Sequence, residues 1–355
     1  MQEVAEDRKF SLSCPDLLHG LFACFTVRGS KPVASYLLAG AGAQVVKGGA
    51  HLVGWSQIET ARHVYDWSIM DQHVNEFSAA GKPSVLLLAP TSYGSTDSYL
   101  PWWFLGPTVD IDGAGSVCAS GRIPVYWNDY FISAWQELLT EAVDRYGSNR
   151  DVVGIRPGFG CGFENYACRN AGPNAKRPCG GLLAGVGYTT GVWVAYLEQM
   201  IDFMGALAPE LFQWSLNYTS YGSHDPANVQ ALAQYAVDAG VKVLVTAGLE
   251  QDDKNSTTGG NDWLEVYAQQ KGLAAMGGQM IGASDPTGTA VVGTNSQRCG
   301  SLATILPWDV QHGVQYLEVY AQDLLSAWDP SNVGYAAAQD DGYPALFSQI
   351  AGLIN

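Results

Sequence analysis

Charge is scarce in this sequence, and positive charge is the scarcest. Asp, Glu, Lys and Arg make up 15% of the 355 residues, against ~25% in an average soluble domain. The 34 acidic residues outnumber the 18 basic ones, which gives a formal net charge of −16. Binding to nucleic-acid phosphates or to an anionic membrane surface needs a basic face. We therefore expect neither a nucleic acid nor a membrane as a partner.

Long apolar runs and metal-binding motifs are absent as well. No apolar run reaches the ~18 residues of a membrane-spanning helix. The six histidines form no HExxH motif and no paired CxxC is present, so the sequence predicts no metal site. It also lacks a GxSxG elbow, a P-loop and a GxGxxG motif after a first strand. We therefore expect no cofactor and no serine-based hydrolysis.

The cysteines and the N-terminal residues bear on the cellular compartment in which the protein is expected. The first ten residues are polar and contain no apolar h-region, so no signal peptide is predicted. Of the seven cysteines, Cys161, Cys168 and Cys179 lie in or beside a stretch rich in Gly, Pro and Asn. Disulfides in such loops are typical of exported proteins, with free thiols as the alternative. We expect the mature form of a secreted or otherwise extracytoplasmic protein, and a cytoplasmic location stays open.

What the sequence does contain is a repeated alternation of short apolar runs and helical patterns. With 47% apolar residues, the chain can form a large core. Several runs are almost continuously hydrophobic, as in parallel strands that are buried on both faces. Eight such runs alternating with helices predict an α/β fold of the (β/α)8 TIM-barrel type, with a doubly wound sheet as the second choice. The predicted strands are 17–27, 43–55, 84–89, 152–159, 211–217, 242–248, 278–283 and 314–320.

The predicted connections differ in length in a regular way. Links from helix to strand are short, whereas links from strand to helix are long, as at 90–128 and 161–189. In (β/α)8 barrels the strand-to-helix loops form the face that carries the active site, and long loops are usually functional. We expect a single catalytic domain over residues 1–355, with 1–12 as an N-terminal extension. The oligomeric state is not predicted.

Glu164 is the first candidate for chemistry because it closes the fourth predicted strand. The glycines that precede it allow the backbone to bend and a ligand to approach. Partial burial of a carboxyl group at such a strand end raises its pKa toward the range of a general acid. The alternative is a structural glutamate that pairs with Arg156 or Arg169.

A second carboxyl group is expected from the eighth strand. Strand alternation places Glu318 on one face with Tyr316 and Tyr320. A lone carboxylate in an apolar strand is costly to bury, so it faces a cleft or is held by tyrosine or backbone donors. Glu250, after the sixth strand, could take its place or be a solvated loop residue. Gln279 opens the seventh predicted strand and is expected to hydrogen-bond a ligand.

Aromatic residues are abundant, with 11 Trp and 18 Tyr. Many fall in the predicted strand-to-helix loops, although core packing is expected to claim a good part of them. Flat aromatic faces beside carboxylates and amides suit sugar rings, whose C–H faces stack while their hydroxyls form hydrogen bonds. The expected substrate-binding residues are Trp55, Trp102, Trp103, Trp127, Arg156, Asn165, Tyr166, Asn217, Glu250, Gln279 and Tyr320.

Three segments together resemble glycoside hydrolases of the large retaining (β/α)8 clan, and β-galactosidase-type members most clearly. Residues 55–59 and 65–71 (WSQIE and YDWSIMD) are similar to the W-S-x-I-E-P and Y-D-W-S-x-L-D pattern of that clan. Residues 124–131 and 145–149 (PVYWNDYF and RYGSN) look like the helix before its fourth strand. Residues 158–164 (GFGCGFE) resemble its G-x-G-x-x-G-E strand end, with Phe163 in place of the last Gly.

The resemblance implies the barrel fold, a carbohydrate substrate, and Glu164 as the acid/base. The clan has its nucleophile at the end of the seventh strand, where this sequence has no Glu. We predict a glycosidase for an oligo- or polysaccharide with Glu164 and Glu318 as the catalytic pair. Carboxyl groups about 5–5.5 Å apart would mean retention, and about 6.5–9.5 Å inversion. The alternatives are a catalytically inactive sugar-binding barrel and, less favoured, a non-sugar hydrolase or lyase.

Overall fold

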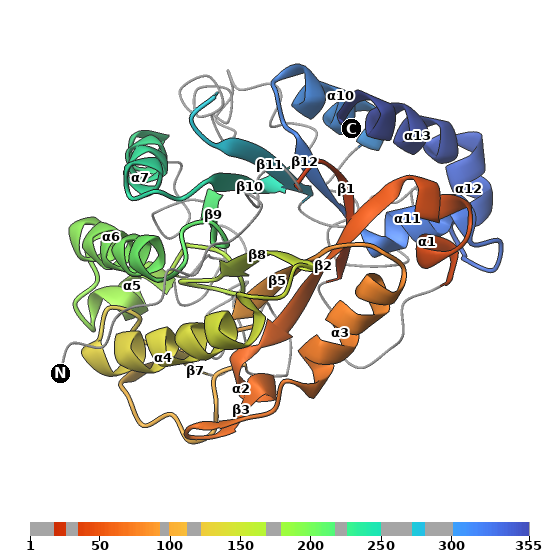
Figure 1. Ribbon diagram of the computed structural model, residues 1–355. Helices are drawn as coiled ribbons and strands as arrows, with labels where there is room; N and C mark the ends of the chain where they lie inside the picture. Colours follow the sequence, from red (N-terminus) through yellow and green to blue (C-terminus); the bar gives the residue numbers. More distant parts are fainter. Residues whose placement is uncertain are drawn as a thin grey trace.

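Eight parallel strands form the centre of the molecule. The computed structural model describes residues 18–25, 35–92, 99–111, 122–167, 179–216, 226–249, 272–280 and 301–354. The strands are β1 (Gly20–Phe25), β2 (Val46–Gly54), β5 (Ser84–Ala89), β8 (Val152–Pro157), β9 (Gln213–Leu216), β10 (Val243–Leu249), β11 (Ala275–Met280) and β12 (Tyr316–Tyr320). Their order is β8-β5-β2-β1-β12-β11-β10-β9, and a parallel bridge between Ile155 and Phe212 joins β8 to the start of β9. This nearly closed barrel (Figure 1) confirms the (β/α)8 prediction.

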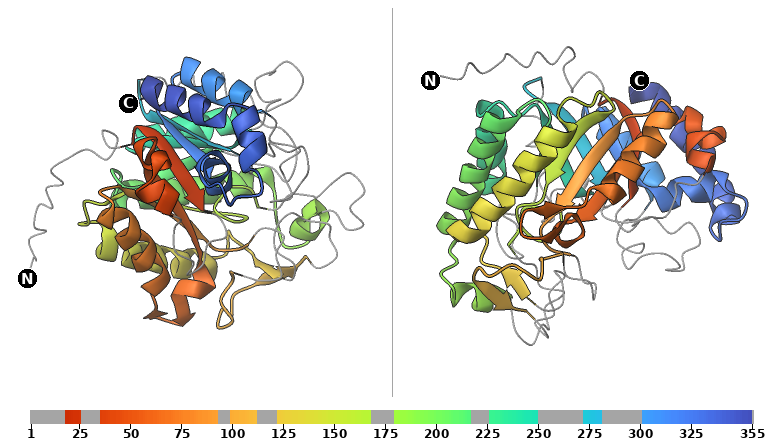
Figure 2. Two further views of the ribbon diagram at one scale, coloured as in Figure 1. Left: turned by 90° about the vertical axis from the view of Figure 1, so that its right-hand side faces the viewer. Right: turned by 60° about the horizontal axis from the view of Figure 1, so that its bottom comes forward.

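Helices surround the barrel and connect successive strands (Figure 2). The helices and short strands are α1 (Ser35–Leu38), η2 (Ala41–Gln44), α2 (Trp55–Ile58), β3 (Glu59–Ala61), β4 (Val64–Tyr65), α3 (Ser68–Ala79), β6 (Thr108–Asp110), β7 (Arg122–Pro124), α4 (Asp129–Tyr146), α5 (Cys179–Ala184), α6 (Thr190–Leu207), α7 (Pro226–Asp238), α10 (Leu302–Gln311), α11 (Ala321–Trp328), α12 (Tyr335–Asp340) and α13 (Tyr343–Ile354). Side-chain caps mark two helix starts beside β8: Asn128 accepts from the Tyr130 amide, and Thr189 from the Val192 amide. Across the described ranges, no helix combines the length and apolarity needed to cross a bilayer.

Apolar side chains form two cores, one on each side of the barrel wall. Side chains alternate along a strand, so neighbouring residues face opposite sides. On β1, Leu21 and Ala23 belong to the outer core under the helices, whereas Phe22 and Cys24 belong to the inner core. Phe163, from the loop after β8, also packs in the inner core. The barrel interior is therefore filled by side chains and is not a pore.

Two strand ends differ from the sequence prediction. β11 runs from Ala275 to Met280, so Gln279 lies near the C-terminal end of the seventh strand and not at its start. Half of the residues in this strand are Ala or Gly, which leaves only a weak hydrophobic signal. β8 ends at Pro157, so Glu164 lies in the following loop and not on the strand. The Gly158 amide still donates to the Leu88 carbonyl of β5, and the residues after it leave the sheet, where the amides of Phe159 and Gly160 donate within a turn of the loop.

Candidate functional site

The loop that follows β8 is folded tightly on itself and carries Glu164. The amides of Phe159 and Gly160 both donate to the Glu164 carbonyl oxygen, at 3.1 and 2.9 Å, and the Glu164 amide donates to the Cys161 carbonyl at 3.2 Å. Every residue from 152 to 167 is buried except Glu164, which is partly exposed. The loop therefore holds one accessible carboxyl group at the face where the barrel strands end.

Glycines make this compact loop possible. A Cβ on Gly158 would lie 2.1 Å from the Gly162 carbonyl oxygen, and one on Gly160 would lie 2.2 Å from the Tyr166 carbonyl oxygen. Gly162 itself has a φ of +63°, a conformation that favours glycine. The glycines noticed in the sequence thus account for the internal packing that positions Glu164.

Hydrogen bonds to β9 and α6 fix the same loop from outside. The Asn165 amide nitrogen donates to the Ser215 carbonyl oxygen at 2.5 Å. On α6, the Trp193 indole donates to the Asn165 carbonyl at 3.2 Å, and the Tyr196 hydroxyl donates to the Phe159 carbonyl at 2.8 Å. Because these hydrogen-bond partners of the loop belong to β9 and α6, the position of Glu164 is determined by the rigid part of the barrel.

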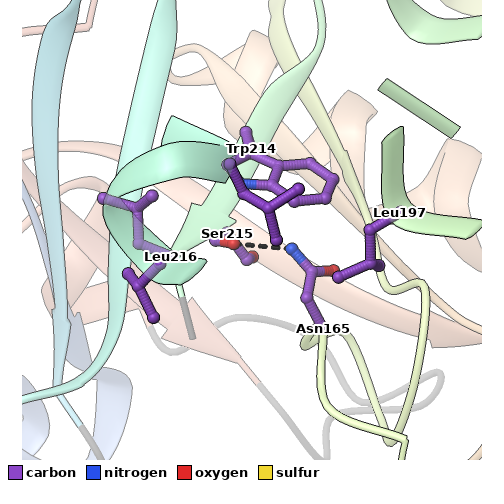
Figure 3. Close-up of a pocket in the computed structure, with 7 residues that line it drawn as sticks. Asn165, Leu197, Trp214, Ser215 and Leu216 are labelled. Carbon is purple, nitrogen blue, oxygen red and sulfur yellow. Dashed lines mark hydrogen bonds between the residues drawn. The ribbon is translucent and has the colours of Figure 1, made fainter. Parts of the chain in front are cut away.

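A small pocket lies behind Asn165, between β9, α6 and α7. Figure 3 shows the Asn165 amide pointing toward Ser215, next to the Trp214 ring. The empty volume of the pocket, including its open part, is about 180 Å³, below the ~300–1,000 Å³ typical of ligand sites. We therefore do not assign it to substrate. Its lining residues are Asn165, Leu197, Trp214, Ser215, Leu216, Val229 and Leu232.

Trp127 is the predicted aromatic residue that lies beside the Glu164 loop. Its ring centroid is 5.7 Å from that of Tyr188 and 6.3 Å from that of Trp193. Trp193 is the residue that hydrogen-bonds the backbone of Asn165. Trp127 is half-buried and precedes α4 in a strand-to-helix connection, on the side of the barrel that carries Glu164.

A buried ion pair crosses the barrel interior. Nη2 of Arg156, on β8, lies 2.5 Å from Oε2 of Glu318, on β12, and 3.3 Å from Oε1 of Gln279, on β11. The Tyr316 hydroxyl donates to Oε1 of Glu318. All four side chains are at most 2% exposed. Arg156 thus pairs with Glu318, and a tyrosine holds this carboxylate as strand alternation had suggested.

Burial and the ion pair together set the ionisation of this cluster. Burial raises the pKa of the Cys24 thiol and of the Tyr316 hydroxyl well above their ordinary values, and the Glu318 charge raises both further. For Arg156, burial is the largest single effect and lowers the pKa, but the attraction and hydrogen bond of Glu318, together with the interactions with Tyr316 and Cys24, raise the pKa overall. Cys24 and Tyr316 are therefore neutral, and Arg156 is charged, at all ordinary pH values.

The three tryptophans predicted near β2 and β5 differ in exposure. Trp55 is buried and its indole donates to the Glu59 carboxylate at 2.8 Å, and Trp103 is buried and donates to the Glu59 carbonyl at 2.9 Å. Trp102 is 77% exposed, while its indole donates to the Thr60 carbonyl at 3.0 Å. Of these three, only Trp102 presents its ring to solvent.

The remaining predicted site residues belong to separate parts of the chain. Tyr166 is buried in the Glu164 loop, and Tyr320 is half-buried at the end of β12. Asn217 and Glu250 lie outside the described residues. No strand or helix periodicity indicates a role for Phe163, whose ring centroid lies 5.6 Å from the Arg156 guanidinium. The only sequence signal for it was its place in the resemblance, where the clan has Gly.

The cysteines near the loop are not all free. Cys161 forms a disulfide, which confirms pairing at the loop cysteines, whereas Cys24 is a buried free thiol. Cys168 lies outside the described residues. In the part of the chain that the structure describes, no three His, Cys, Asp or Glu residues cluster as metal ligands.

Comparison with known proteins adds information on the fold. No family model and no curated protein matches this sequence. A β-galactosidase from the Antarctic haloarchaeon Halorubrum lacusprofundi matches with a TM-score of 0.50 and 12% identity, over 94% of this chain and 58% of that chain. Xylanase 10B from Thermotoga petrophila RKU-1, solved with xylobiose, matches with a TM-score of 0.51 and 8% identity, over 99% of both chains.

An exo-β-1,4-mannosidase from Opitutaceae bacterium strain TAV5 matches with a TM-score of 0.47 and 10% identity, over 94% of this chain and 60% of that chain. The chain thus spans less than two thirds of the mannosidase and the β-galactosidase, but nearly all of the xylanase. At these identities the likeness concerns the fold. The matches to the β-galactosidase and the xylanase agree with the (β/α)8 barrel fold.

Proposed function

We propose that the protein is a glycoside hydrolase that cleaves an oligo- or polysaccharide. The observation that carries the proposal is the partial exposure of Glu164 alone in a buried, hydrogen-bonded loop at the C-terminal end of β8. A general acid must reach the leaving oxygen and must be held in place, and this loop meets both needs. In the proposal Glu164 protonates the glycosidic oxygen, and the half-buried Trp127 stacks on a sugar ring.

Glu318 is the proposed second carboxylate. Arg156 and Tyr316 donate to its two oxygens and hold the carboxyl group in place. Glu164 and Glu318 have different surroundings, one partly open and one buried in an ion pair. Such a difference allows one carboxyl group to serve as acid while the other stays ionised.

The test is product release from a panel of aryl glycosides and polysaccharides. Wild type is compared with Glu164→Gln and with Glu210→Gln, a half-exposed glutamate in the link between α6 and β9 at the opposite end of the barrel. We expect hydrolysis by wild type and Glu210→Gln and its loss in Glu164→Gln. Full activity of Glu164→Gln on the same substrate would remove Glu164 from the mechanism.

The second candidate function is a sugar-binding barrel without hydrolysis. It is favoured by Gln279, an amide near the end of the seventh strand, where the clan named above has its nucleophile. Saturable binding of a polysaccharide with no turnover by the wild type would support this reading. Turnover that depends on Glu164 would exclude it.

We also propose that the protein acts outside the cytoplasm, because Cys161 forms a disulfide and disulfides persist in oxidising compartments. Thiol alkylation of protein taken directly from the producing cells, with and without reduction, tests this. Protection of Cys161 that is lost on reduction is the expected result, and full labelling without reduction contradicts it.

A further inference from the structure

Asn165, which follows Glu164, turns its side chain toward the barrel wall. It is 2% exposed, and its amide nitrogen donates to the Ser215 carbonyl oxygen on β9 at 2.5 Å (Figure 3). Its amide oxygen accepts from the Phe159 amide at 3.4 Å, and the same Phe159 amide donates to the Glu164 carbonyl. Both ends of the Asn165 amide are therefore used inside the protein, which favours a positioning role over contact with a sugar.

Ser215 holds the residues on both sides of Glu164. Its carbonyl oxygen accepts from the Asn165 side chain, and its hydroxyl donates to the Phe163 carbonyl oxygen at 3.3 Å. Ser215 is 1% exposed and pairs in register with Val245 on β10, so it is part of the barrel wall. One residue of a barrel strand thus fixes the chain directly before and directly after the proposed acid.

The first half of the loop has a separate anchor. Thr91 lies just after the end of β5, and its hydroxyl donates to the Gly160 carbonyl and accepts from the Gly162 amide, both at 3.2 Å. These hydrogen bonds involve neither Asn165 nor Ser215. A substitution at Asn165 should therefore loosen the end of the loop that carries Glu164, while the first half stays attached to Thr91.

The position of Glu164 matters because a general acid acts over a short distance. Its carboxyl group must come within ~2.6–3.2 Å of the oxygen that it protonates, and a misplacement of ~1 Å can lower the rate about 100-fold. Resting on the proposed function, we propose that Asn165 and Ser215 are positioning residues that hold Glu164 at the leaving oxygen. Neither touches the substrate, and both act through the backbone on either side of Glu164.

Dependence on the leaving group distinguishes this role from others. As the glycosidic C–O bond breaks, its electron pair stays on the leaving oxygen, which takes the proton of Glu164. A phenol needs this proton to leave, whereas dinitrophenolate is stable enough to leave without it. Loss of acid positioning therefore slows cleavage of a phenyl glycoside and spares a dinitrophenyl glycoside. A folding defect or weaker sugar binding slows the cleavage of both substrates alike.

The test measures kcat/KM on the phenyl and dinitrophenyl glycosides of the mono- or oligosaccharide that the wild type hydrolyses best. For Asn165→Ala we expect a fall of roughly 10- to 100-fold on the phenyl glycoside and of less than about 3-fold on the dinitrophenyl glycoside. Ser215→Ala keeps the carbonyl and loses only the hydroxyl, so its fall should be about 2- to 5-fold, on the phenyl glycoside alone. Ser215→Thr keeps the hydroxyl and should restore the wild-type ratio.

Asn149→Ala is the matched control, because the Asn149 side chain also binds the backbone, at the Asp151 amide in the link before β8. It should leave the ratio of the two constants unchanged, and this ratio does not depend on the folded fraction. Equal falls on both substrates in Asn165→Ala, or no fall on either, overturn the inference, while a selective fall in Glu164→Gln keeps the proposed acid. Equal falls in Glu164→Gln, or no hydrolysis by the wild type, overturn the proposed function and the inference with it.

Discussion

Nη2 of Arg156 lies 2.5 Å from Oε2 of Glu318, and 162 positions along the sequence separate the two residues. Both side chains are shielded from solvent. In such surroundings a single charge without its partner is unfavourable by several kcal/mol, whereas the intact pair is close to neutral for stability. The pair therefore ties the fourth strand to the eighth, and each member depends on the other.

Breaking this pair should destabilise the fold strongly. We expect Glu318→Gln to lower the free energy of unfolding by about 3–5 kcal/mol, because Arg156 becomes an uncompensated buried charge. The double variant Arg156→Met/Glu318→Gln should recover most of this loss, since the charge is gone and Gln can still accept from Tyr316. Urea unfolding of the wild type, both single variants and the double variant gives the coupling energy. Additive single effects would contradict the coupling.

Glu164→Gln should lower activity strongly and change stability little, unlike Glu318→Gln. The backbone hydrogen bonds of Glu164, which the substitution leaves in place, hold the loop, so we expect a change in stability of no more than about 0.5–1 kcal/mol. Activity should fall about 10²–10⁴-fold because the general acid is lost. Thermal unfolding and initial rates on the best substrate of the panel are the measurements. A large loss of stability with unchanged activity per folded molecule would show that Glu164 is structural.

Substitution of the buried Trp55 should lower stability, whereas substitution of the exposed Trp102 should mainly weaken ligand binding. Trp55→Ala removes a fully buried ring and should cost about 3–5 kcal/mol of stability. Trp102→Ala should cost about 1 kcal/mol or less, while it weakens polysaccharide binding roughly 2- to 10-fold through lost stacking. Binding is measured in the Glu164→Gln background, so that turnover does not interfere. Equal affinity with and without the Trp102 ring would remove it from the binding surface.

Stability should fall at alkaline pH. Burial raises the pKa of the Cys24 thiol above its ordinary value of 9.0, and the pKa values of Tyr126, Tyr196 and Tyr316 above the ordinary 10.0. Above these values the unfolded chain loses protons that the folded protein keeps, so stability is intact below about pH 9 and declines as pH rises. Each group contributes up to about 1.4 kcal/mol per pH unit in that window.

Urea unfolding midpoints measured between pH 8 and pH 11 test the prediction that stability falls at alkaline pH. Tyrosinate absorbance over the same range reports the ionisation of the tyrosines. Tyr126→Phe removes one of the four groups and should reduce the steepness of the decline. A stability that is flat or rises over this range would contradict the assignment of these side chains as neutral and buried.

Two neighbouring tryptophans show that a sequence pattern does not predict burial within a loop. Trp102 and Trp103 follow one another in a polar loop and looked alike, yet one is 77% exposed and the other 7%. Their indoles both donate to carbonyls of β3, at Thr60 and Glu59. Outside helices and strands no fixed period relates sequence position to burial, so a local pattern could not distinguish them.

The sequence by itself determined a parallel sheet covered by helices, because eight apolar runs of strand length alternate with helical patterns, and it favoured a barrel over a doubly wound sheet. It also determined that Tyr316 and Glu318 share a face, since strand periodicity is local. Only the tertiary structure decided that Arg156 meets Glu318, that Gln279 ends its strand, and that Glu164 alone in its loop stays accessible. These relationships join distant segments, and closure of the barrel, not local propensity, brings such segments together.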